Sequence, residues 1–396
     1  MAAILVVDRS ASPLGGEAAV VAWVLQALIE AHDVTVLTWS PADLEGLNHY
    51  YGTTLNARSF RLKHAPWTLR AALQIDPGHR ARLYPQAMLW RWARWLGRDH
   101  DIVFYALGEC DIGANGLQYV TYPWLAGRVR RLRQLAEAQS MACRSRAVLE
   151  LIRPWRLMSG FRVERMLAMR TLATSEWTAA ILRREYGIDA PVLYPPVPGP
   201  FPVTEWEQRR LGFVCVGRFA PEKRIDMIVT ILDRLRGLGH AVELTVIGTR
   251  VNSRNPAYDA ELSQVFREHR SWVHVVEDLP RGEMLALIAE HRFGIHGHPC
   301  EHFGIAVAEM VKCGCIVFAP NDGGQVEILG GDARLLYDGV EDAVSRIDAV
   351  MRSDAIQREL RGRLNQVGAQ FGVERFMDGL RAVVSEQISV DGREAA

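Results

Sequence analysis

The 396-residue sequence predicts an α/β protein made of two doubly wound domains that face a central cleft. Two observations support this fold class. Short apolar runs alternate with helix-length segments along most of the chain, as strands and helices do when they pack onto a parallel sheet. A proline-rich stretch interrupts this alternation near the middle, and the chain is long enough for two domains of ordinary size.

The first half of the chain predicts one complete domain, which we place at residues 1–195. Its first strand is expected at residues 3–8 (AILVVD) and its first helix at residues 17–30, directly after Gly15 and Gly16. The later strands are expected at residues 33–39, 102–107, 117–122 and 171–175.

A change of composition separates this half from the next. Residues 191–206 contain six prolines, which fix the backbone and cannot donate to a strand ladder. We therefore place a linker at residues 196–208 and a second doubly wound domain at residues 209–372. One further helix is expected within residues 373–396, where it would pack back on the first domain.

The charge balance argues against a nucleic-acid partner, because 46 basic and 46 acidic side chains cancel. The charges are nevertheless uneven, with eleven Arg and three Glu between residues 123 and 170. Two interpretations of this arginine-rich segment stay open. Its arginines cover solvated helix faces, or they contact anionic lipid and bring the protein to a membrane-bound acceptor.

The apolar runs are too short for a membrane span or a signal peptide. The first run ends at Asp8 and Arg9, and no run reaches the roughly 18 residues that a spanning helix needs. The six cysteines form no C-x-x-C pair, and we expect buried free thiols. These features predict a cytoplasmic protein, or one that is peripheral at the inner face of the membrane.

The segment VGRFAPEK at residues 216–223 brings two cations to the end of an expected strand. Arg218 and Lys223 flank a short turn that opens the next helix, and Lys223 is one of only three lysines in the chain. A guanidinium and an ammonium beside the N–H groups of a helix start suit a diphosphate. The alternative is two solvated surface cations.

A second candidate segment, HGHPCEHFGIAVAEM, covers residues 296–310. Glu301 is expected in a loop and Glu309 on an otherwise apolar helix, so the two carboxylates would reach opposite ends of one elongated ligand. Main-chain N–H groups at the helix start would point at oxygen atoms of that ligand. The residues that supply these groups are His302, Phe303, Gly304 and Ile305.

These segments resemble the retaining GT-B glycosyltransferases of family four, the group 1 glycosyl transferases. The resemblance rests on G-R-x(4)-K at residues 217–223, E-x(7)-E at residues 301–309 and GGQVE at residues 323–327, in this order and each after an expected strand. It implies the GT-B fold, with two Rossmann-like domains. It covers almost the whole chain, and its motifs are strong from about residue 171 onward.

The resemblance also implies roles for the site residues. Arg218 and Lys223 would bind the donor diphosphate, Glu301 would contact the transferred sugar, and Glu309 would hold the nucleotide ribose. Arg218, Lys223 and Glu301 would be the catalytic residues.

The segments TSEWTAAIL at residues 174–182, YPPV at residues 194–197 and EHFGIAVAE are most similar to mannosyltransferases that extend lipid-linked oligosaccharides with GDP-mannose. They imply transfer of a hexose, with mannose favoured, from a GDP- or UDP-sugar to a hydroxyl acceptor. That acceptor is a glycan, a lipid-linked saccharide or a small molecule.

The acceptor side has fewer candidates. By analogy with the family, Gly16 would approach the donor phosphate or the acceptor, and Gly15 would lie beside it. Family members often carry a histidine near the reacting carbon, but Thr121 stands at the expected position in QYVTYPWL. Either Thr121 or Tyr122 takes the place of that histidine, or the acceptor is positioned differently.

The family mechanism would retain the anomeric configuration by front-face attack, in which the leaving phosphate takes the acceptor's proton. It needs no cofactor and no divalent metal. His296, His298 and His302 suggest a metal site, but we expect none, because strand alternation would place His296 and His298 on one face and His302 in the loop.

Three other functions are alternatives for a two-domain α/β protein of this kind. A GT-B-type nucleotide-sugar epimerase is the nearest enzyme alternative. A non-catalytic sugar-binding protein would share the cleft, but it would ordinarily be exported. A nicotinamide oxidoreductase would need a G-x-G-x-x-G turn after a strand, and the sequence has none.

Overall fold

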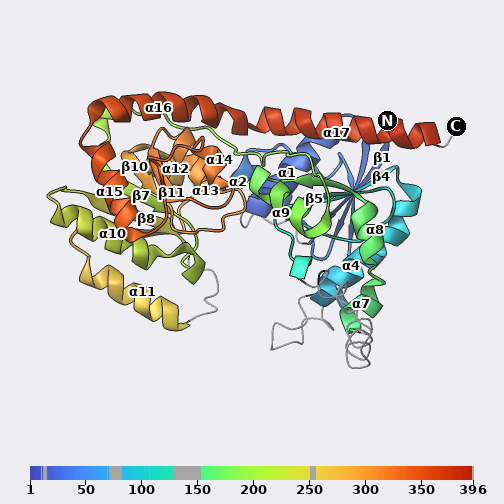
Figure 1. Cartoon of the computed structure of the whole chain (residues 1–396). Helices are drawn as coiled ribbons and strands as arrows, with labels where there is room; N and C mark the ends of the chain where they lie inside the picture. Colours follow the sequence, from blue (N-terminus) through green and yellow to red (C-terminus); the bar gives the residue numbers. More distant parts are fainter. Residues whose placement is uncertain are drawn as a thin grey trace. The chain divides into compact units, whose positions relative to one another are not determined.

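A computed structural model describes residues 1–9, 11, 16–68, 70, 83–106, 108–127, 130, 153–249 and 256–394. Gly15 and much of the arginine-rich segment, residues 128–129 and 131–152, lie outside the described residues. The chain divides into two compact units (Figure 1). Unit 1 comprises Met1–Pro198 together with Val373–Ala396, and unit 2 comprises Gly199–Gly372.

Unit 1 is built on a six-stranded parallel sheet with the order β3-β2-β1-β4-β5-β6. The strands are β1 (Ala3–Asp8), β2 (Asp33–Thr38), β3 (Arg61–His64), β4 (Ile102–Tyr105), β5 (Gly116–Val120) and β6 (Arg170–Ala173). The described helices are α1 (Gly16–Leu28), α2 (Leu44–Tyr51), α4 (Leu83–Leu96), α7 (Pro154–Ser159), α8 (Val163–Ala168), α9 (Glu176–Tyr186) and α17 (Val373–Glu394).

Both faces of this sheet are covered, because successive side chains of a strand point to opposite faces. Ile4 of β1 belongs to a core cluster that includes α1 and the α17 residue Leu380. Leu5, the next residue of β1, belongs to a second cluster that contains Trp90 of α4. Helix α17 is therefore part of the unit 1 core, and the Arg381 guanidinium also donates to the carbonyl of Ala27 in α1 over 3.0 Å.

Unit 2 has a second six-stranded parallel sheet with the order β12-β11-β10-β7-β8-β9. The strands are β7 (Arg210–Val216), β8 (Glu243–Gly248), β9 (Val273–Glu277), β10 (His291–Ile295), β11 (Ile316–Pro320) and β12 (Leu336–Tyr337). The helices are α10 (Ile225–Gly237), α11 (Pro256–Glu268), α12 (Arg281–Ala289), α13 (Ile305–Lys312), α14 (Gln325–Ile328), α15 (Val340–Met351) and α16 (Asp354–Gly368).

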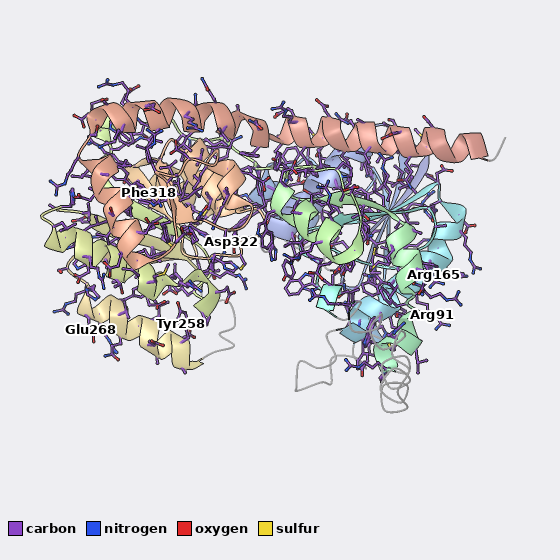
Figure 2. The ribbon with its side chains drawn as sticks, in the orientation of Figure 1. Arg91, Arg165, Tyr258, Glu268, Phe318 and Asp322 are labelled. Carbon is purple, nitrogen blue, oxygen red and sulfur yellow. The ribbon has the colours of Figure 1, made fainter. Side chains whose placement is uncertain are left out.

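Three phenylalanines pack together across the middle of this sheet. Phe213 of β7 stacks on Phe293 of β10 with a centroid distance of 5.1 Å. Phe318 of β11, labelled in Figure 2, lies 6.3 Å from both rings. All three side chains are fully buried, which holds the three strands that carry the candidate site in one rigid layer.

The strand order puts a topological switch point in each sheet. In unit 2 the chain leaves β7 toward β8 and β9, and returns on the other side of β7 as β10. Ligands of open parallel sheets bind outside the carboxyl ends of the strands at such a point. The loops after β7 and β10 are the two segments that carry G-R-x(4)-K and E-x(7)-E.

The predicted fold class is confirmed, since each unit is a doubly wound parallel sheet. One local expectation was wrong, because β10 ends at Ile295 and residues 296–298 form a loop. Strand alternation therefore does not decide where His296 and His298 point. The sequence interpretation also missed the edge strand β3 and the helices α15 and α16.

Candidate functional site

The loop after β7 turns Lys223 inward and leaves Arg218 in solvent. A short 3-10 turn, Pro221–Lys223, is followed by Arg224 in the left-handed region, with φ 48° and ψ 46°. The Arg218 side chain is 65% exposed and lies 3.4 Å from the Glu222 carboxylate, four residues on. Lys223 is only 16% exposed, so the two expected diphosphate ligands differ strongly in burial.

Lys223 contacts Glu301, as one donor site would require. Its Nζ lies 2.6 Å from Oε2 of Glu301, and Nε2 of His296 lies 3.0 Å from the same oxygen. Burial alone would raise the pKa of Glu301, but the hydrogen bond from His296 and the charge of Lys223 outweigh it and hold the pKa well below its ordinary value. Glu301 is therefore ionised at neutral pH.

His296 is a neutral hydrogen-bond donor in this cluster. Burial lowers its pKa, although the neighbouring Glu301 carboxylate acts in the opposite direction. Because an ionised carboxylate only accepts, the proton between the two groups belongs to Nε2 of His296. The backbone of His296 is fixed as well, since its N–H donates to the Phe318 carbonyl over 2.9 Å and its carbonyl accepts from the Tyr337 hydroxyl.

Glycines let the loops of the site approach one another closely. A Cβ on Gly297 would lie 2.5 Å from the carbonyl oxygen of Lys223. Gly323 has φ 85°, and a Cβ there would lie 2.4 Å from the carbonyl oxygen of Glu301. The next residue, Gly324, donates its N–H to the same oxygen over 2.8 Å. The GGQVE segment thus braces the loop that carries Glu301.

Gln325 completes this brace from a fully buried position. Its Nε2 lies 2.8–3.0 Å from the carbonyl oxygens of His298 in the loop after β10, of Pro320 at the end of β11 and of Asp322 in the loop after β11. Asp322, labelled in Figure 2, belongs to the loop after β11. The carboxyl ends of β10 and β11 are tied together through this one side chain.

Helix α13 begins four residues after Glu301. Gly304 is its N-cap residue with φ 105°, and Ile305 is its first residue. The Phe303 side chain is buried and packs against Phe371 at a centroid distance of 5.3 Å, so only its main chain is suited to contact a ligand. Burial lowers the pKa of His302, which favours a neutral ring.

Glu309 lies inside the unit and pairs with an arginine that the sequence interpretation missed. Its Oε1 is 2.6 Å from Nη1 of Arg281, the first residue of α12, and the Glu309 side chain is only 5% exposed. Burial raises the pKa of Glu309, and Arg281 partly offsets the increase. A buried carboxylate requires a cationic or hydrogen-bonding partner, but sequence spacing does not reveal which arginine provides it.

The expected acceptor-side residues lie in unit 1. Gly16 is the exposed first residue of α1, and Thr121 and Tyr122 directly follow β5. The Thr121 carbonyl accepts from the Thr178 hydroxyl over 3.0 Å. Tyr122 stacks on Trp177 with a centroid distance of 6.1 Å.

A buried acid, also missed from sequence, supports the turn after β5. Glu109 accepts from the Leu125 N–H over 2.9 Å and from the Tyr186 hydroxyl. Burial raises its pKa to about 7, against the effect of these hydrogen bonds. The adjacent Trp124 side chain is 65% exposed, so a buried carboxylate fixes the backbone beside an exposed aromatic ring.

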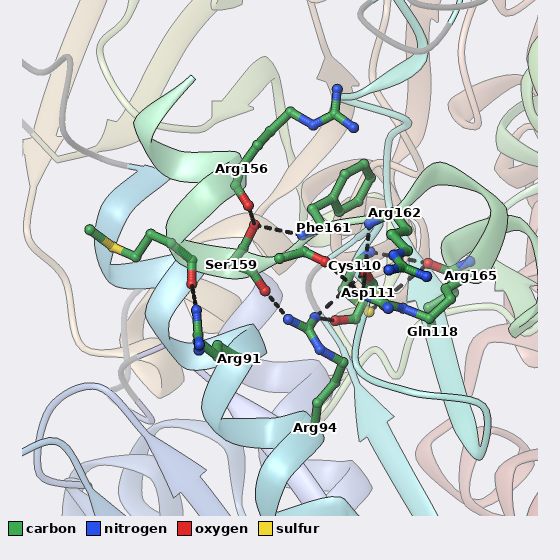
Figure 3. Close-up of polar contacts among 12 residues, drawn as sticks. Arg91, Arg94, Cys110, Asp111, Gln118, Arg156, Ser159, Phe161, Arg162 and Arg165 are labelled. Atoms are coloured by element: carbon green, nitrogen blue, oxygen red, sulfur yellow. Dashed lines mark hydrogen bonds and ion pairs between the residues drawn. The ribbon is translucent and has the colours of Figure 1, made fainter. Parts of the chain in front are cut away.

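Part of the arginine-rich segment has a structural role (Figure 3). Asp111 is fully buried, lies 2.6 Å from Nη2 of Arg165, and accepts from the Arg162 N–H over 2.7 Å. Arg94 of α4 approaches the same carboxylate to 3.6 Å. These arginines hold α4, α8 and the loop after β4 together, and contact of the segment with lipid stays a prediction.

Neither a metal-binding cluster nor a membrane-spanning helix is found among the described residues. No group of three or more His, Cys, Asp or Glu side chains in the described part of the chain is arranged to hold a metal ion. No helix among the same residues is both long enough and apolar enough to cross a membrane.

The fold is that of a known structural class. Both units are similar to solved GT-B structures along nearly their whole length. HepE of Anabaena, in complex with UDP and glucose, superimposes with a TM-score of 0.66 at 14% identity and covers 98% of this chain and 100% of its own. Sucrose-phosphate synthase from Thermosynechococcus elongatus superimposes with a TM-score of 0.67 at 15% identity, and the match covers 98% of this chain and 100% of that protein's chain. At this identity the likeness shows the fold alone.

Sequence comparisons match part of the chain. Residues 201–370 match the family model described as glycosyl transferases group 1. Curated relatives named GDP-Man:Man(3)GlcNAc(2)-PP-Dol alpha-1,2-mannosyltransferase are similar to part of the chain. The protein of Xenopus tropicalis is 27% identical over 176 residues, 42% of this chain and 35% of its own length. The protein of Candida glabrata is 24% identical over 254 residues, which cover 57% of this chain and 48% of its own length. The chain therefore spans less than half of these relatives.

Proposed function

We propose that this protein is a retaining glycosyltransferase that transfers a hexose, with mannose favoured, from a nucleotide diphosphate sugar to a hydroxyl acceptor. The observation that carries the proposal is the Lys223–Glu301–His296 cluster at the switch point of the unit 2 sheet. This cluster lies within the residues that match the family model. The names of the mannosyltransferase relatives support a GDP-linked donor, and the HepE complex makes a UDP-linked donor the alternative.

In this proposal Lys223 and Arg218 bind the donor diphosphate. A cation held at the carboxyl end of the sheet stabilises the charge that develops on the leaving phosphate. Lys223 is already fixed by Glu301, so it needs little reorganisation when the donor arrives. Arg218 is exposed, and in this proposal it contacts the diphosphate from the solvent side.

Glu301 contacts the transferred sugar. Because its pKa is held well below the ordinary value, it accepts hydrogen bonds from sugar hydroxyls and stabilises positive charge at the anomeric carbon. The leaving phosphate takes the acceptor's proton by front-face attack, and the protein supplies no nucleophile and no cofactor. Glu309 would hold the ribose while sharing its carboxylate with Arg281.

The acceptor is proposed to bind to unit 1, beside Gly16, Thr121 and Tyr122. A lipid-linked saccharide is favoured, because the curated relatives carry a dolichol-linked oligosaccharide in their names. We propose that the protein works in the cytoplasm or at the inner face of the membrane, and that the arginine-rich segment provides the contact.

A thermal-shift screen of nucleotides and nucleotide sugars, followed by product analysis with one radiolabelled donor, tests this function. We expect GDP-mannose or a UDP-hexose to raise the melting temperature and the label to move to an acceptor. An epimerase would leave the label on the nucleotide, and a binding protein would leave the donor unchanged. Either result would contradict the proposal.

A further inference from the structure

A basic recess lies at the edge of the unit 2 sheet that is opposite to the proposed donor site. It has a volume of about 370 Å³ and is formed by residues before β7, the end of α13 and one face of α16. Four of its lining residues are cationic, Arg209, Lys312, Arg358 and Arg361, and none is acidic. We call this recess the amino-edge pocket.

Its position follows from the direction of the strands. Arg209 directly precedes β7, and Cys315, another lining residue, directly precedes β11. Glu301 and Lys223 come after the carboxyl ends of β10 and β7. Since all strands of the sheet are parallel, the two sites are on opposite edges and share no residue.

Two cations of the pocket, Arg209 and Arg361, contact neutral groups. The Arg209 guanidinium donates to the carbonyl oxygens of Thr204 (3.0 Å) and His291 (3.3 Å). Arg361 lies over the Trp206 ring, 4.4 Å from its centroid, and its Nε is buried without a hydrogen-bond partner. A buried charged donor that lacks an acceptor is costly unless something else supplies one.

Acidic side chains are close by, yet they do not line the recess. Glu359 follows Arg358 in α16, but its Oε1 lies 2.9 Å from Nη2 of Arg334. Glu205 and Glu207 flank Trp206 in the sequence, and neither contributes to the lining. The net charge of the lining is therefore positive, in a chain whose total charge is zero.

We propose that the amino-edge pocket binds the phosphate group of a ligand other than the sugar donor. The guanidinium fork of arginine matches two phosphate oxygens, and the exposed side chain of Arg358 offers such a fork to a ligand in the pocket. The volume is about twelve times the roughly 30 Å³ that one water occupies in the liquid, which is room for a phosphate with an organic group attached. Trp206 and the stem of Lys312 provide the apolar wall for that group.

The probe for the test is inorganic pyrophosphate, measured by calorimetry at low ionic strength. The background is the Arg218→Gln/Lys223→Met variant, which removes both cations of the proposed donor site. We expect pyrophosphate to bind this background, and Arg358→Gln added to it to raise the Kd at least tenfold. Arg270→Gln, at another exposed arginine of unit 2, is the matched control and should leave the Kd unchanged.

Arg358 is the first choice for substitution because its side chain is exposed, so Arg358→Gln should not disturb folding. Arg361→Gln is the second variant, and its thermal unfolding is measured beside its affinity, since Arg361 also packs on Trp206. Loss of affinity with an unchanged melting temperature separates binding from structure.

Vesicles distinguish a lipid headgroup from a free phosphate compound. If the ligand is a lipid, the background variant will sediment with phosphatidylglycerol vesicles but not with phosphatidylcholine vesicles, and Arg358→Gln will reduce the bound fraction. If it is a free compound, only pyrophosphate binding will depend on Arg358. The proposal is wrong if neither probe binds, or if both bind equally well to the Arg358→Gln and Arg270→Gln variants. The outcome does not depend on whether the donor assignment is correct.

Discussion

Replacement of Lys223 by methionine tests how the candidate donor site works. The substitution keeps the length and apolar stem of the side chain and removes only the charge that lies 2.6 Å from Glu301. Two costs follow: the donor diphosphate loses one charge-assisted contact, and the Glu301 carboxylate is left beside His296 without its cation.

The first cost sets the expected change in affinity. A hydrogen bond to a charged group contributes about 1.5–3 kcal/mol, which corresponds to a roughly 10- to 150-fold weaker nucleoside diphosphate complex. The second cost adds repulsion between Glu301 and the diphosphate. The stability of the free protein should fall by only about 1–2 kcal/mol, between the values for exposed and buried ion pairs, because both side chains are partly exposed.

Calorimetric titration of GDP and UDP into the wild type and the variant measures the effect. Lys63→Met, at an exposed lysine of β3, is the control and should bind as the wild type does. The double variant Lys223→Met/Glu301→Gln should regain part of the lost affinity, because the unpaired carboxylate is gone. An unchanged Kd for Lys223→Met would refute the diphosphate assignment.

Three further predictions concern Glu301, Glu109 and Gly323. Glu301→Gln should lower turnover by about 10²–10³-fold and change the Kd of GDP less than threefold, since it removes charge next to the anomeric carbon; equal losses in both would contradict the sugar-contact role. Glu109 binds its proton more tightly in the folded state, with a pKa of about 7 against 4.5, so stability should fall by up to about 3 kcal/mol as pH rises from 4.5 through 7. Urea melts across this range should show a smaller fall for Glu109→Gln, and an identical slope would count against the assignment. Gly323→Ala should cost about 1–3 kcal/mol, because φ is 85° and the Cβ meets the Glu301 carbonyl. Gly282→Ala, where a Cβ meets nothing within 4 Å, should not destabilise, and equal melting temperatures for the two variants would refute this role of Gly323.

The fold could be predicted because most strands are short apolar runs bounded by helices. Strand β1 shows this directly, with both of its faces buried in different core clusters. Strand β3 escaped prediction because all four of its residues, RLKH, are exposed at the edge of the sheet. An edge strand with one partner needs no apolar pattern, so its sequence resembles that of a loop.

One part of the candidate site could be predicted, because residues that directly follow neighbouring parallel strands lie at the same edge of the sheet. Lys223 and Glu301 each follow a central strand of the same sheet, and the structure brings their side chains into contact. The partners that set the pKa values were harder to find. His296 was assigned to a strand that ends one residue earlier, and Arg281 reaches Glu309 from another helix, 28 positions away in the sequence.

The roles assigned to Arg218, Lys223, Glu301 and Glu309 stay predictions, as do those of the acceptor-side residues. Gly15 lies outside the described residues, and Gly16 and Thr121 lie in unit 1. Thr121 stands where the family resemblance implies a histidine. A hydroxyl is not protonated near neutral pH as an imidazole is, so the sequence does not determine which group acts at this position.

The most direct test of the proposed function is a transfer assay with GDP-mannose labelled in the sugar and a lipid diphosphate-linked oligosaccharide as acceptor. The wild type should move the label into the lipid phase with the anomeric configuration of the donor, and Glu301→Gln should move at least a hundredfold less in the same time. An inverted linkage would contradict the retaining mechanism. Equal transfer by the wild type and Glu301→Gln, or no transfer from any GDP- or UDP-hexose, would contradict the central claim.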